Sequence, residues 1–423
     1  MKVIPGSKIL RYVTIAGIFL ITGALITGIP GSYGVGGDDT YPSQDLEIQT
    51  WYDLDAIRDN LDGDHILMND LDSTSPGYDE LAGPTANGGK GWKPIGFVTN
   101  STGPDNIPTP SIGCSEPVLA DAVYPWHGLT GSFDGQGYEI LDLFINRPDG
   151  SHIGLFITNR GLIKDVGVVN ATVISGDWVG NLVGENIGIV SNSYSTGNTS
   201  GHNHVGGLVG ENSGTVSNSY FTGNMTGHSG LGGLVGWNYW GTVSDSYSTS
   251  DVSGYSSVGG LVGFNYYAIV SNSYSSGIAT GNKDVGGLVG ANMGLNYFSD
   301  ILNSYSTSDV TGDVRIGGLL GYNHYGTVSN SYSTGNVSGN EDVGGLLGLN
   351  DESTVSRSFW DIETSGQATS DGGTGKTTAQ MQDITTFSGA GWNIIAVALN
   401  ATDPAYIWNI VNNVTYPFLS WQS

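Results

Sequence analysis

Two pairs of acidic residues could take part in cleavage of a glycosidic bond, because that reaction uses carboxyl side chains. Glu185 and Glu211 occupy the same place in two successive near-copies, Gly-Asn-Leu-Val-Gly-Glu-Asn at 180–186 and Gly-Gly-Leu-Val-Gly-Glu-Asn at 206–212. Asp134 and Asp142 lie nearer the N-terminus. Such cleavage needs two carboxyl groups across a groove, and the basic residues that would hold an acidic sugar are scarce here. We expect no catalytic residues, and a polysaccharide lyase or hydrolase remains the alternative.

A metal site is the second chemistry to consider. His202 and His228 precede equivalent leucines by the same number of residues, so their imidazoles should stack and could share a metal ion. The next copies offer Tyr255 and Asn282 at that place, which supplies no third ligand. We therefore expect no metal site and no cofactor.

Calcium stays open as an alternative on the same side of the repeats. Acidic residues at this edge could hold Ca²⁺ through carboxylate and carbonyl oxygens, although they lack the dense spacing of a dedicated calcium loop. They are Asp177, Asp284, Asp313, Glu341 and Asp342.

Aromatic residues gather at one point of successive repeats and form the candidate binding site. They are Trp237, Tyr239, Trp240, Phe264, Tyr266, Tyr267, Tyr297, Phe298, Tyr322 and Tyr325. Equivalent positions in stacked repeats would form one continuous stripe. Exposed apolar stripes usually mark interaction sites, and aromatic faces stack on the C–H faces of sugars. We expect a glycan or a surface protein as partner; packing of these rings on one another is the competing interpretation.

The elements that position these residues are set by a repeat. Its leucines recur 26 to 31 residues apart, as subtraction of their numbers shows: Leu155, Leu182, Leu208, Leu234, Leu261, Leu288, Leu319 and Leu346. A fixed period of this size indicates one supersecondary unit stacked on its own copies. Apolar runs of two to four residues between Gly, Asn and Ser are typical of short strands. The sequence predicts an all-β, parallel β-solenoid of about eight coils, right-handed or left-handed, capped at both ends.

An asparagine follows each of these leucines four places later. The column comprises Asn159, Asn186, Asn212, Asn238, Asn265, Asn292, Asn323 and Asn350. Side-chain amides stacked in register can bond from one coil to the next and can satisfy turn backbone. We expect a structural asparagine ladder. A Ser column and a Tyr column also recur; small Ser facing in and Tyr facing out is favoured, whereas strict alternation would reverse them.

The Gly-Leu-Val-Gly core resembles the GLUG motif repeats of secreted and surface-anchored prokaryotic proteins, including segments beside some IgA-type metallopeptidases. The resemblance implies a β-solenoid at the cell exterior, usually assigned to adhesion or left unassigned. It does not bring the peptidase activity, because no His is followed by Glu and the zinc motif His-Glu-x-x-His is therefore absent. A purely structural envelope or spacer protein is a further alternative.

The net charge and the order of segments along the chain indicate an exported protein that does not bind nucleic acid. A net charge of −26 argues against nucleic acid as a partner, because nucleic acid needs a basic patch. Lys2, Lys8 and Arg11 precede an uncharged run to Ile29, which predicts a signal peptide or N-terminal anchor at 1–34, and only an uncleaved segment would contact a membrane. We expect a linker at 35–48, an N-terminal cap leading into the stack at 49–149, the solenoid at 150–360 and a C-terminal cap at 361–423. Seven Asn-x-Ser/Thr sequons fit an exported, glycosylated surface protein.

Overall fold

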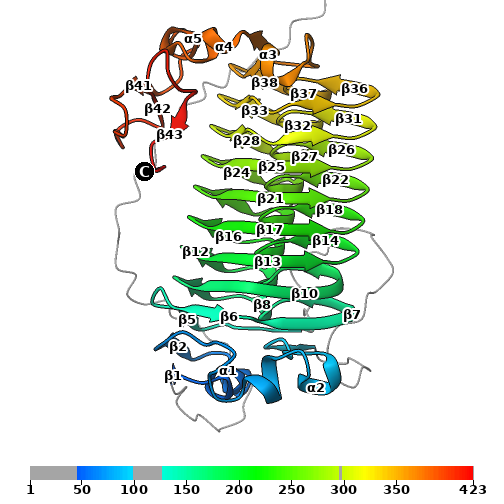
Figure 1. The fold of residues 1–423 in the computed structure, drawn as a ribbon, viewed down its shortest axis with the longest axis vertical. Coiled ribbons are helices and arrows are strands. Elements are labelled where there is room, and N and C mark those ends of the chain that lie inside the picture. The colour runs from blue at the N-terminus through cyan, green and yellow to red at the C-terminus, as the bar shows by residue number, and fades with distance from the viewer. Residues whose placement is uncertain (1–44, 99–125, 295–297, 423) are drawn as a thin grey trace, which may run out of the picture. The chain divides into compact units, whose positions relative to one another are not determined.

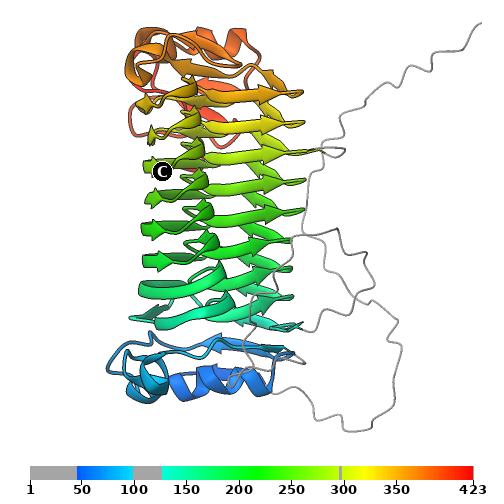
Figure 2. The same cartoon turned by 90° about the vertical axis from the view of Figure 1, so that its right-hand side faces the viewer.

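The predicted parallel β-solenoid is confirmed (Figure 1). The structure, a computed structural model, describes residues 45–98, 126–294 and 298–422, all within the compact unit Ser43–Ser423. The expected signal peptide or anchor at 1–34 lies outside the described residues. Within those ranges no helix is both long and apolar enough to cross a bilayer. Successive coils stack strand on strand along three sheets, and Figure 2 shows the regular pile of coils from the side.

Sheet A has eleven strands in parallel register, ordered along the stack as they are along the chain. They are β1 (Leu46–Ile48), β2 (Asp64–Leu67), β5 (Ser132–Asp134), β9 (Leu162–Lys164), β12 (Ile189–Ser191), β16 (Thr215–Ser217), β20 (Thr242–Ser244), β24 (Ile269–Ser271), β28 (Asp300–Leu302), β33 (Thr327–Ser329) and β38 (Thr354–Ser356). Strand β1 falls at the end of the segment expected to be a linker, so the stack begins before the first repeat.

Sheet C has eight parallel strands, one for each of the eight repeats. They are β8 (Phe156–Asn159), β11 (Val183–Asn186), β15 (Val209–Asn212), β19 (Val235–Tyr239), β23 (Val262–Tyr266), β27 (Val289–Met293), β32 (Leu320–His324) and β37 (Leu347–Asp351). The leucine before each strand is fully buried, as expected for the core column.

Sheet B comprises two rows of strands, joined where the long strands β7 and β10 run through both rows. Its strands are β6 (Glu139–Leu141), β7 (Phe144–Ile153), β10 (Gly167–Val179), β13 (Tyr194–Ser200), β14 (Asn203–Gly206), β17 (Tyr220–Thr226), β18 (Ser229–Gly232), β21 (Tyr247–Ser253), β22 (Ser256–Gly259), β25 (Tyr274–Thr280), β26 (Lys283–Gly286), β29 (Tyr305–Ser306), β30 (Asp309–Thr311), β31 (Val314–Gly317), β34 (Tyr332–Ser333), β35 (Val337–Ser338), β36 (Glu341–Gly344), β39 (Phe359–Asp361) and β40 (Thr374–Lys376).

The N-terminal cap closes the first coils with short helices. They are α1 (Trp51–Ala56), the 3₁₀ turn η1 (Ile57–Asp59), the π turn η2 (Tyr78–Ala82) and α2 (Ala86–Gly89), with an antiparallel pair β3 (Phe97–Val98) and β4 (Trp126–His127). Helix α1 begins with a capping box between Thr50 and Asp53, which satisfies two free backbone donors. Trp51 and Trp92 are fully buried with ring centroids 5.6 Å apart, and they cover the end of the core.

The corner between sheets A and B explains why Ser faces in and Tyr faces out. Asn192, Asn218 and Asn303 stand at this corner with φ of 48° to 49°, a left-handed conformation that Asn tolerates better than most residues. This left-handed Asn interrupts the in–out alternation of side chains along the strand. The following Ser is buried: Ser193 and Ser219 are each 1% exposed, and the backbone N–H of Ser193 donates to Ser219 Oγ at 3.2 Å.

Sheets B and C approach each other too closely for side chains at one position per coil. A Cβ added to Gly236 would lie 2.4 Å from the carbonyl carbon of His204 and 2.6 Å from the nitrogen of Val205. Real Cβ atoms do not come this close to backbone, so only glycine fits. This contact accounts for the second glycine of the Gly-Leu-Val-Gly core.

The outward tyrosines form a ladder along the corner of sheets A and B. Tyr194, Tyr220, Tyr247, Tyr274, Tyr305 and Tyr332 stack with centroids 4.7 to 5.1 Å apart and nearly parallel planes. The first four rings are half-buried, whereas Tyr305 and Tyr332 are buried.

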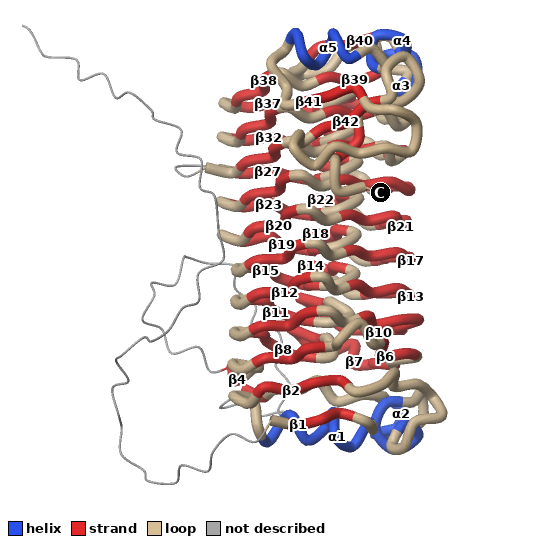
Figure 3. The backbone as a smooth tube through the Cα atoms, turned by 90° about the vertical axis from the view of Figure 1, so that its left-hand side faces the viewer, coloured by secondary structure: helices blue, strands red, loops and turns tan. Residues whose placement is uncertain are grey.

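The C-terminal segment buries the upper part of this tyrosine ladder. It contains α3 (Ile362–Ser365), α4 (Thr378–Met381), α5 (Ile384–Gly389), β41 (Ile394–Ala396), β42 (Trp408–Ile410) and β43 (Phe418–Leu419). Figure 3 shows β41 and β42 beside the coils rather than only beyond the last one. The Trp421 ring lies 5.8 Å from Tyr274, and Gln422 donates to the Tyr305 hydroxyl at 2.7 Å. The segment is thus an end cap and also a lateral cover.

Candidate functional site

The asparagine column forms an unbroken ladder of amide hydrogen bonds. Each Nδ2 donates to the Oδ1 of the asparagine one coil further on, at 2.8 to 2.9 Å from Asn159 through to Asn350. The first seven side chains are fully buried, and Asn350 at the end is half-buried. Several also donate to a backbone carbonyl of the neighbouring coil, as Asn212 does to Thr242 at 3.2 Å. The ladder holds one edge of sheet C in place.

The turns that follow this ladder carry the aromatic residues in a strained conformation. The turns after Asn238, Asn265, Asn323 and Asn350 hold one residue more than the turns at Asn186 and Asn212, and the turn after Asn292 is longer still. At three of them the added residue is Trp240, Tyr267 or Tyr325, with φ of 60°, 53° and 54°. A bulky residue with positive φ is an outlier that costs about 1–2 kcal/mol. Gly or Asn would fit each turn at lower cost, so the aromatic side chains are retained against a local penalty.

Two further rows of rings lie on sheet C beside these turns. Trp237 pairs in register with Phe264, and Tyr239 with Tyr266. The Tyr239 and Tyr266 rings stack with centroids 5.8 Å apart, and Trp240 lies 4.8 Å from Tyr267. We call these six residues, together with Tyr322 and Tyr325, the aromatic band. The rings pack on one another and remain partly exposed, Trp240 by 47% and Tyr325 by 39%.

The aromatic band is interrupted at one coil, so the stripe expected to be continuous has two aromatic parts. Strand β27 places Ala291 between Phe264 and Tyr322, and Met293 between Tyr266 and His324. Ala291 is buried, and half-buried Met293 keeps the surface apolar across the gap. Phe298, in the insertion after β27, is 84% exposed, and Tyr297 lies outside the described residues.

Three residues that sequence reasoning missed extend the aromatic band onto sheet B. The rings of His152, Trp178 and His204 stack in that order, and His204 lies 4.7 Å from Trp237. Each has φ of 54° to 55°. Burial lowers the pKa of His204 to about 4, so it is a neutral ring at pH 7. The signal that could have found them is their shared place two residues before the Gly that opens the Leu motif.

Glu185 and Glu211 lie directly opposite each other on β11 and β15, and Glu211 faces Trp237 on the next strand. The other two acids suggested for catalysis are elsewhere: Asp134 ends β5 of sheet A, and Asp142 follows β6 of sheet B and accepts from Asn170. Burial raises the pKa of both glutamates, and Glu185 adds to the effect on Glu211, whose pKa reaches about 8. The arrangement is a pair of neighbouring carboxyl groups at the end of the aromatic band, with Glu185 buried and Glu211 half-buried.

From the raised pKa values of Glu185 and Glu211 we predict that the free energy of unfolding falls as pH rises. Above about pH 4.5 the unfolded chain releases these protons, whereas the folded chain keeps that of Glu211 until about pH 8. The folded state thus binds more protons in this window, so its free energy of unfolding declines between these values. We expect Glu211→Gln to flatten the decline, measured by chemical denaturation at several pH values, with exposed Glu341→Gln as control. An unchanged slope in Glu211→Gln would count against this assignment.

The residues considered for metal binding do not converge. His202 and His228 stack with centroids 5.0 Å apart, and Tyr255 continues the stack at 5.2 Å. On the acidic edge Asp284 forms an ion pair with Arg315 at 2.6 Å. Among the residues that the structure describes, no group of three or more His, Cys, Asp or Glu side chains is placed to hold an ion.

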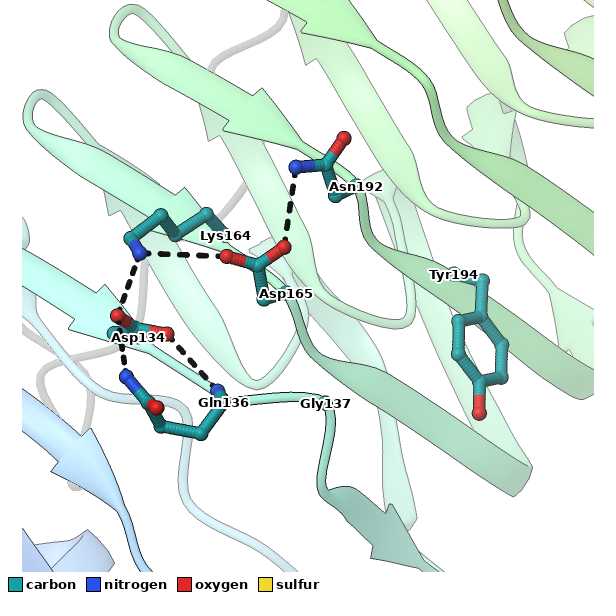
Figure 4. A pocket seen from close by; sticks show the side chains of 7 residues that line it. All are labelled: Asp134, Gln136, Gly137, Lys164, Asp165, Asn192 and Tyr194. Carbon is teal, nitrogen blue, oxygen red and sulfur yellow. Dashed lines mark hydrogen bonds and ion pairs between the residues drawn. The ribbon is translucent and has the colours of Figure 1, made fainter. Parts of the chain in front are cut away.

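A polar pocket at the N-terminal end of the tyrosine ladder is a second site that sequence reasoning missed. It is open to solvent, has a volume of about 360 Å³ and is lined by Asp134, Gln136, Gly137, Lys164, Asp165, Asn192 and Tyr194 (Figure 4). The Lys164 ammonium lies 2.6 Å from an Asp134 oxygen and 3.3 Å from an Asp165 oxygen. Burial works against the charge of Asp134, but hydrogen bonds from Lys164 and Gln136 hold its pKa below the usual range.

Comparison with known proteins supports the repeat assignment made from the sequence. Five consecutive segments match the GLUG motif: residues 201–226, 227–253, 254–280, 281–311 and 312–338. These five segments are GLUG repeats. Each one spans one coil of the stack, and the turns of the aromatic band at Trp240, Tyr267 and Tyr325 lie within them. The coils at 150–200 and 339–360 are outside the matched segments.

Relatives share part of this chain. A Gly-rich membrane protein of Evansella cellulosilytica is 35% identical in an alignment of 203 residues that covers 44% of this chain and 19% of that protein. Halomucin of Haloquadratum walsbyi is 35% identical over 89 residues, which are 21% of this chain and 1% of halomucin. The chain therefore spans less than a fifth of the length of either relative.

Two solved structures resemble the fold at low identity. An IgA1 protease has a TM-score of 0.41 at 14% identity, covering 70% of this chain and 22% of that chain. A structure assigned to an immunoglobulin A1 protease from Bacteroides ovatus has a TM-score of 0.40 at 18% identity, covering 88% of this chain and 91% of that chain.

Proposed function

We propose that this chain is an exported, non-catalytic surface module whose GLUG solenoid binds glycan through the aromatic band. The observation that carries the proposal is the set of strained turns: Trp240, Tyr267 and Tyr325 hold bulky rings at positive φ where smaller residues would be cheaper. Strain that is kept at a surface points to a role for the side chain. Partly exposed Trp and Tyr rings supply the apolar faces and polar tips that sugars bind.

The setting of the band agrees with a location outside the cell. One relative is named as a membrane protein and the other as a halomucin, and both names fit a surface or exported protein. An excess of acidic residues, 39 against 13 basic ones, keeps such a surface soluble and disfavours nucleic acid. A neutral sugar needs no basic residues, and the aromatic band offers ring faces rather than charge.

The enzyme alternative has less support from the positions of the acids. Glu185 is 7% exposed and Glu211 is half-buried, and they are neighbours on one sheet rather than on two walls of a groove. A carbohydrate-active enzyme would lose turnover in Glu185→Gln and Glu211→Gln. A non-catalytic module binds its glycan equally well with either variant and releases no product.

The experiment that tests the function is a glycan-array screen of residues 43–423, run with Ca²⁺ and with a chelator. Selective binding in both conditions supports a calcium-independent glycan module. Binding lost in chelator would instead assign the affinity to the acidic edge. A folded protein that binds no glycan contradicts the proposal, and capture of a surface protein by the same face would then be the alternative to pursue.

The aromatic turns make a sharp prediction for this screen. We expect a triple variant, Trp240→Gly with Tyr267→Gly and Tyr325→Gly, to bind at least tenfold more weakly, since each lost ring contact contributes about 0.5–1.5 kcal/mol. Its free energy of unfolding should change by only about 1 kcal/mol, because relief of positive-φ strain offsets lost ring packing. The control is Tyr255→Ala, which removes a ring that is 52% exposed and lies outside the aromatic band. Equal affinity in the triple variant would refute the assignment.

A further inference from the structure

One coil departs from the repeat at two positions that face the same space. Where the coils above carry Ser191, Ser217 and Ser244 at the end of the sheet A strand, this coil carries Lys164. Where the coils above carry the tyrosines of the ladder, it carries Gly167, in register with Tyr194. Packing of the coils does not require Lys164 or Gly167, because Ser and Tyr occupy the same two positions in the coils above.

The two departures set two walls of the polar pocket, one through Lys164 itself and one through the Tyr194 ring that lies over Gly167. A Cβ on Gly167 would lie 2.6 Å from Cζ of Tyr194, so the Tyr194 ring leans over the glycine, and its hydroxyl donates to Glu139 two strands below. Because Gly167 has no side chain, the Tyr194 ring lies over it, and the edge of this ring borders the pocket. In Figure 4 Tyr194 stands on one side of the pocket and Lys164 with its two carboxylates on the other.

The polar wall is a fixed network with spare hydrogen-bonding capacity. Asp165 accepts from Asn192 Nδ2 at 3.1 Å and from Lys164, and Asp134 accepts from Gln136 Nε2 at 2.7 Å and from Gln136 N at 2.9 Å. A carboxylate has about four acceptor sites and an ammonium three donors, so each keeps capacity on its open side. Lys164 and Asp165 side chains are both 35% exposed. Their positions are set before any ligand arrives.

The charges of this wall select the class of ligand. The Lys164 ammonium lies between the carboxylates of Asp134 and Asp165, where a metal ion would otherwise bind. This disfavours a cation as ligand. Asp134, Asp165 and Glu139 outnumber Lys164, which disfavours an anion. What remains is a neutral molecule with many hydroxyl groups, small enough to lie beside the edge of the Tyr194 ring. A volume of about 360 Å³ lies in the range of small-molecule sites.

We propose that this pocket binds one neutral monosaccharide unit, with its hydroxyl groups on Asp134, Lys164, Asp165 and Asn192 and its C–H groups against the edge of the Tyr194 ring. The pocket lies at the corner of sheets A and B, whereas the aromatic band lies on sheet C and its turns. It is a second sugar site of different construction, one that grips a single unit by hydrogen bonds. Its existence does not depend on the function proposed for the aromatic band.

The test is a titration of the folded unit 43–423 with methyl α-glucopyranoside, methyl β-galactopyranoside and methyl α-mannopyranoside, followed by saturation-transfer NMR and calorimetry. We expect at least one to bind in the millimolar range. Lys164→Ser installs the residue that the repeat itself uses, so folding should be retained, and binding should fall at least tenfold. Asp165→Asn keeps the shape and the tolerance for positive φ, and it should also weaken binding.

Two controls show whether sugar binding belongs to this pocket. Asp245→Asn changes the same corner position three coils higher and should bind as the unchanged protein does. The triple glycine variant of the aromatic band should also retain this binding, which keeps the two proposals distinguishable. The proposal is overturned if none of the three sugars binds, if Lys164→Ser binds equally well, or if Ca²⁺ or inorganic phosphate alone binds here and displaces the sugar.

Discussion

Replacing Asn238 with alanine is expected to lower the free energy of unfolding by about 3–5 kcal/mol. Asn238 sits in the middle of the ladder, fully buried, accepting from Asn212 and donating to Asn265, each at 2.8 Å. Its removal leaves one buried donor and one buried acceptor without partners, and each unsatisfied group costs about 1–3 kcal/mol. The loss of packing around the missing amide adds to this. Chemical denaturation followed by circular dichroism measures the effect.

The end of the same ladder provides the matched control. Asn350 is half-buried and is the last member, accepting from Asn323 at 2.9 Å. Asn350→Ala should therefore cost only about 1 kcal/mol, because water can reach the group that is left over. If the two variants lost equal stability, or if Asn238→Ala lost none, the amide ladder would not be a major source of stability. A solenoid can also unfold from its ends, so the two variants should be compared by local hydrogen exchange as well.

The second large effect on the free energy of unfolding is expected from substitutions in the tyrosine ladder. Its size should depend on how far the C-terminal segment covers each ring. Tyr332 is 1% exposed, stacks on Tyr305 at 4.9 Å and lies 5.8 Å from Trp408 of the C-terminal segment, while its hydroxyl donates to the carbonyl of Pro417. Tyr332→Ala should lower the free energy of unfolding by about 4 kcal/mol, as large aromatic deletions in a core do. It should also loosen the C-terminal segment, which makes this segment more sensitive to protease.

Tyr220→Ala is the control within the same ladder. Tyr220 stacks equally well, with rings at 4.7 Å and 4.8 Å on either side, but it is half-buried and the C-terminal segment does not reach it. We expect a loss of about 1–2 kcal/mol from the two ring contacts, with no change in proteolysis of the C-terminal segment. A loss as large as that of Tyr332→Ala would show that stacking, and not coverage, sets the stability of the ladder.

Sequence reasoning predicted the parts of the fold that recur. The buried leucines, the column from Asn159 to Asn350 and the placing of aromatic residues on neighbouring coils all follow from a period, because stacked copies put equivalent residues in register. The choice between Ser inward and Tyr inward could not be made in this way. It depends on a left-handed residue such as Asn192 at the corner, and alternation alone does not reveal it.

What does not recur was harder to predict. The C-terminal segment has no repeat, so its return along Tyr274, Tyr305 and Tyr332 had no signal beyond its aromatic residues. The polar pocket lies where Lys164 and Gly167 replace the repeat residues in a single coil. A comparison of the repeats shows what they share, so it does not point to a change in one coil. The interruption of the aromatic band at Ala291 is likewise a single departure, and it divides a stripe that the period alone makes continuous.

The central claim is that the aromatic band is the surface that meets the glycan. It is tested most directly by hydroxyl-radical footprinting of the 43–423 unit with and without a glycan selected from the array. We predict lower oxidation of Trp240, Tyr267 and Tyr325 on binding, with no change at Tyr52 and Tyr255, which are 51% and 52% exposed on other surfaces. Protection at Tyr52 or Tyr255 instead, or unchanged oxidation of Trp240 under saturating glycan, would contradict it.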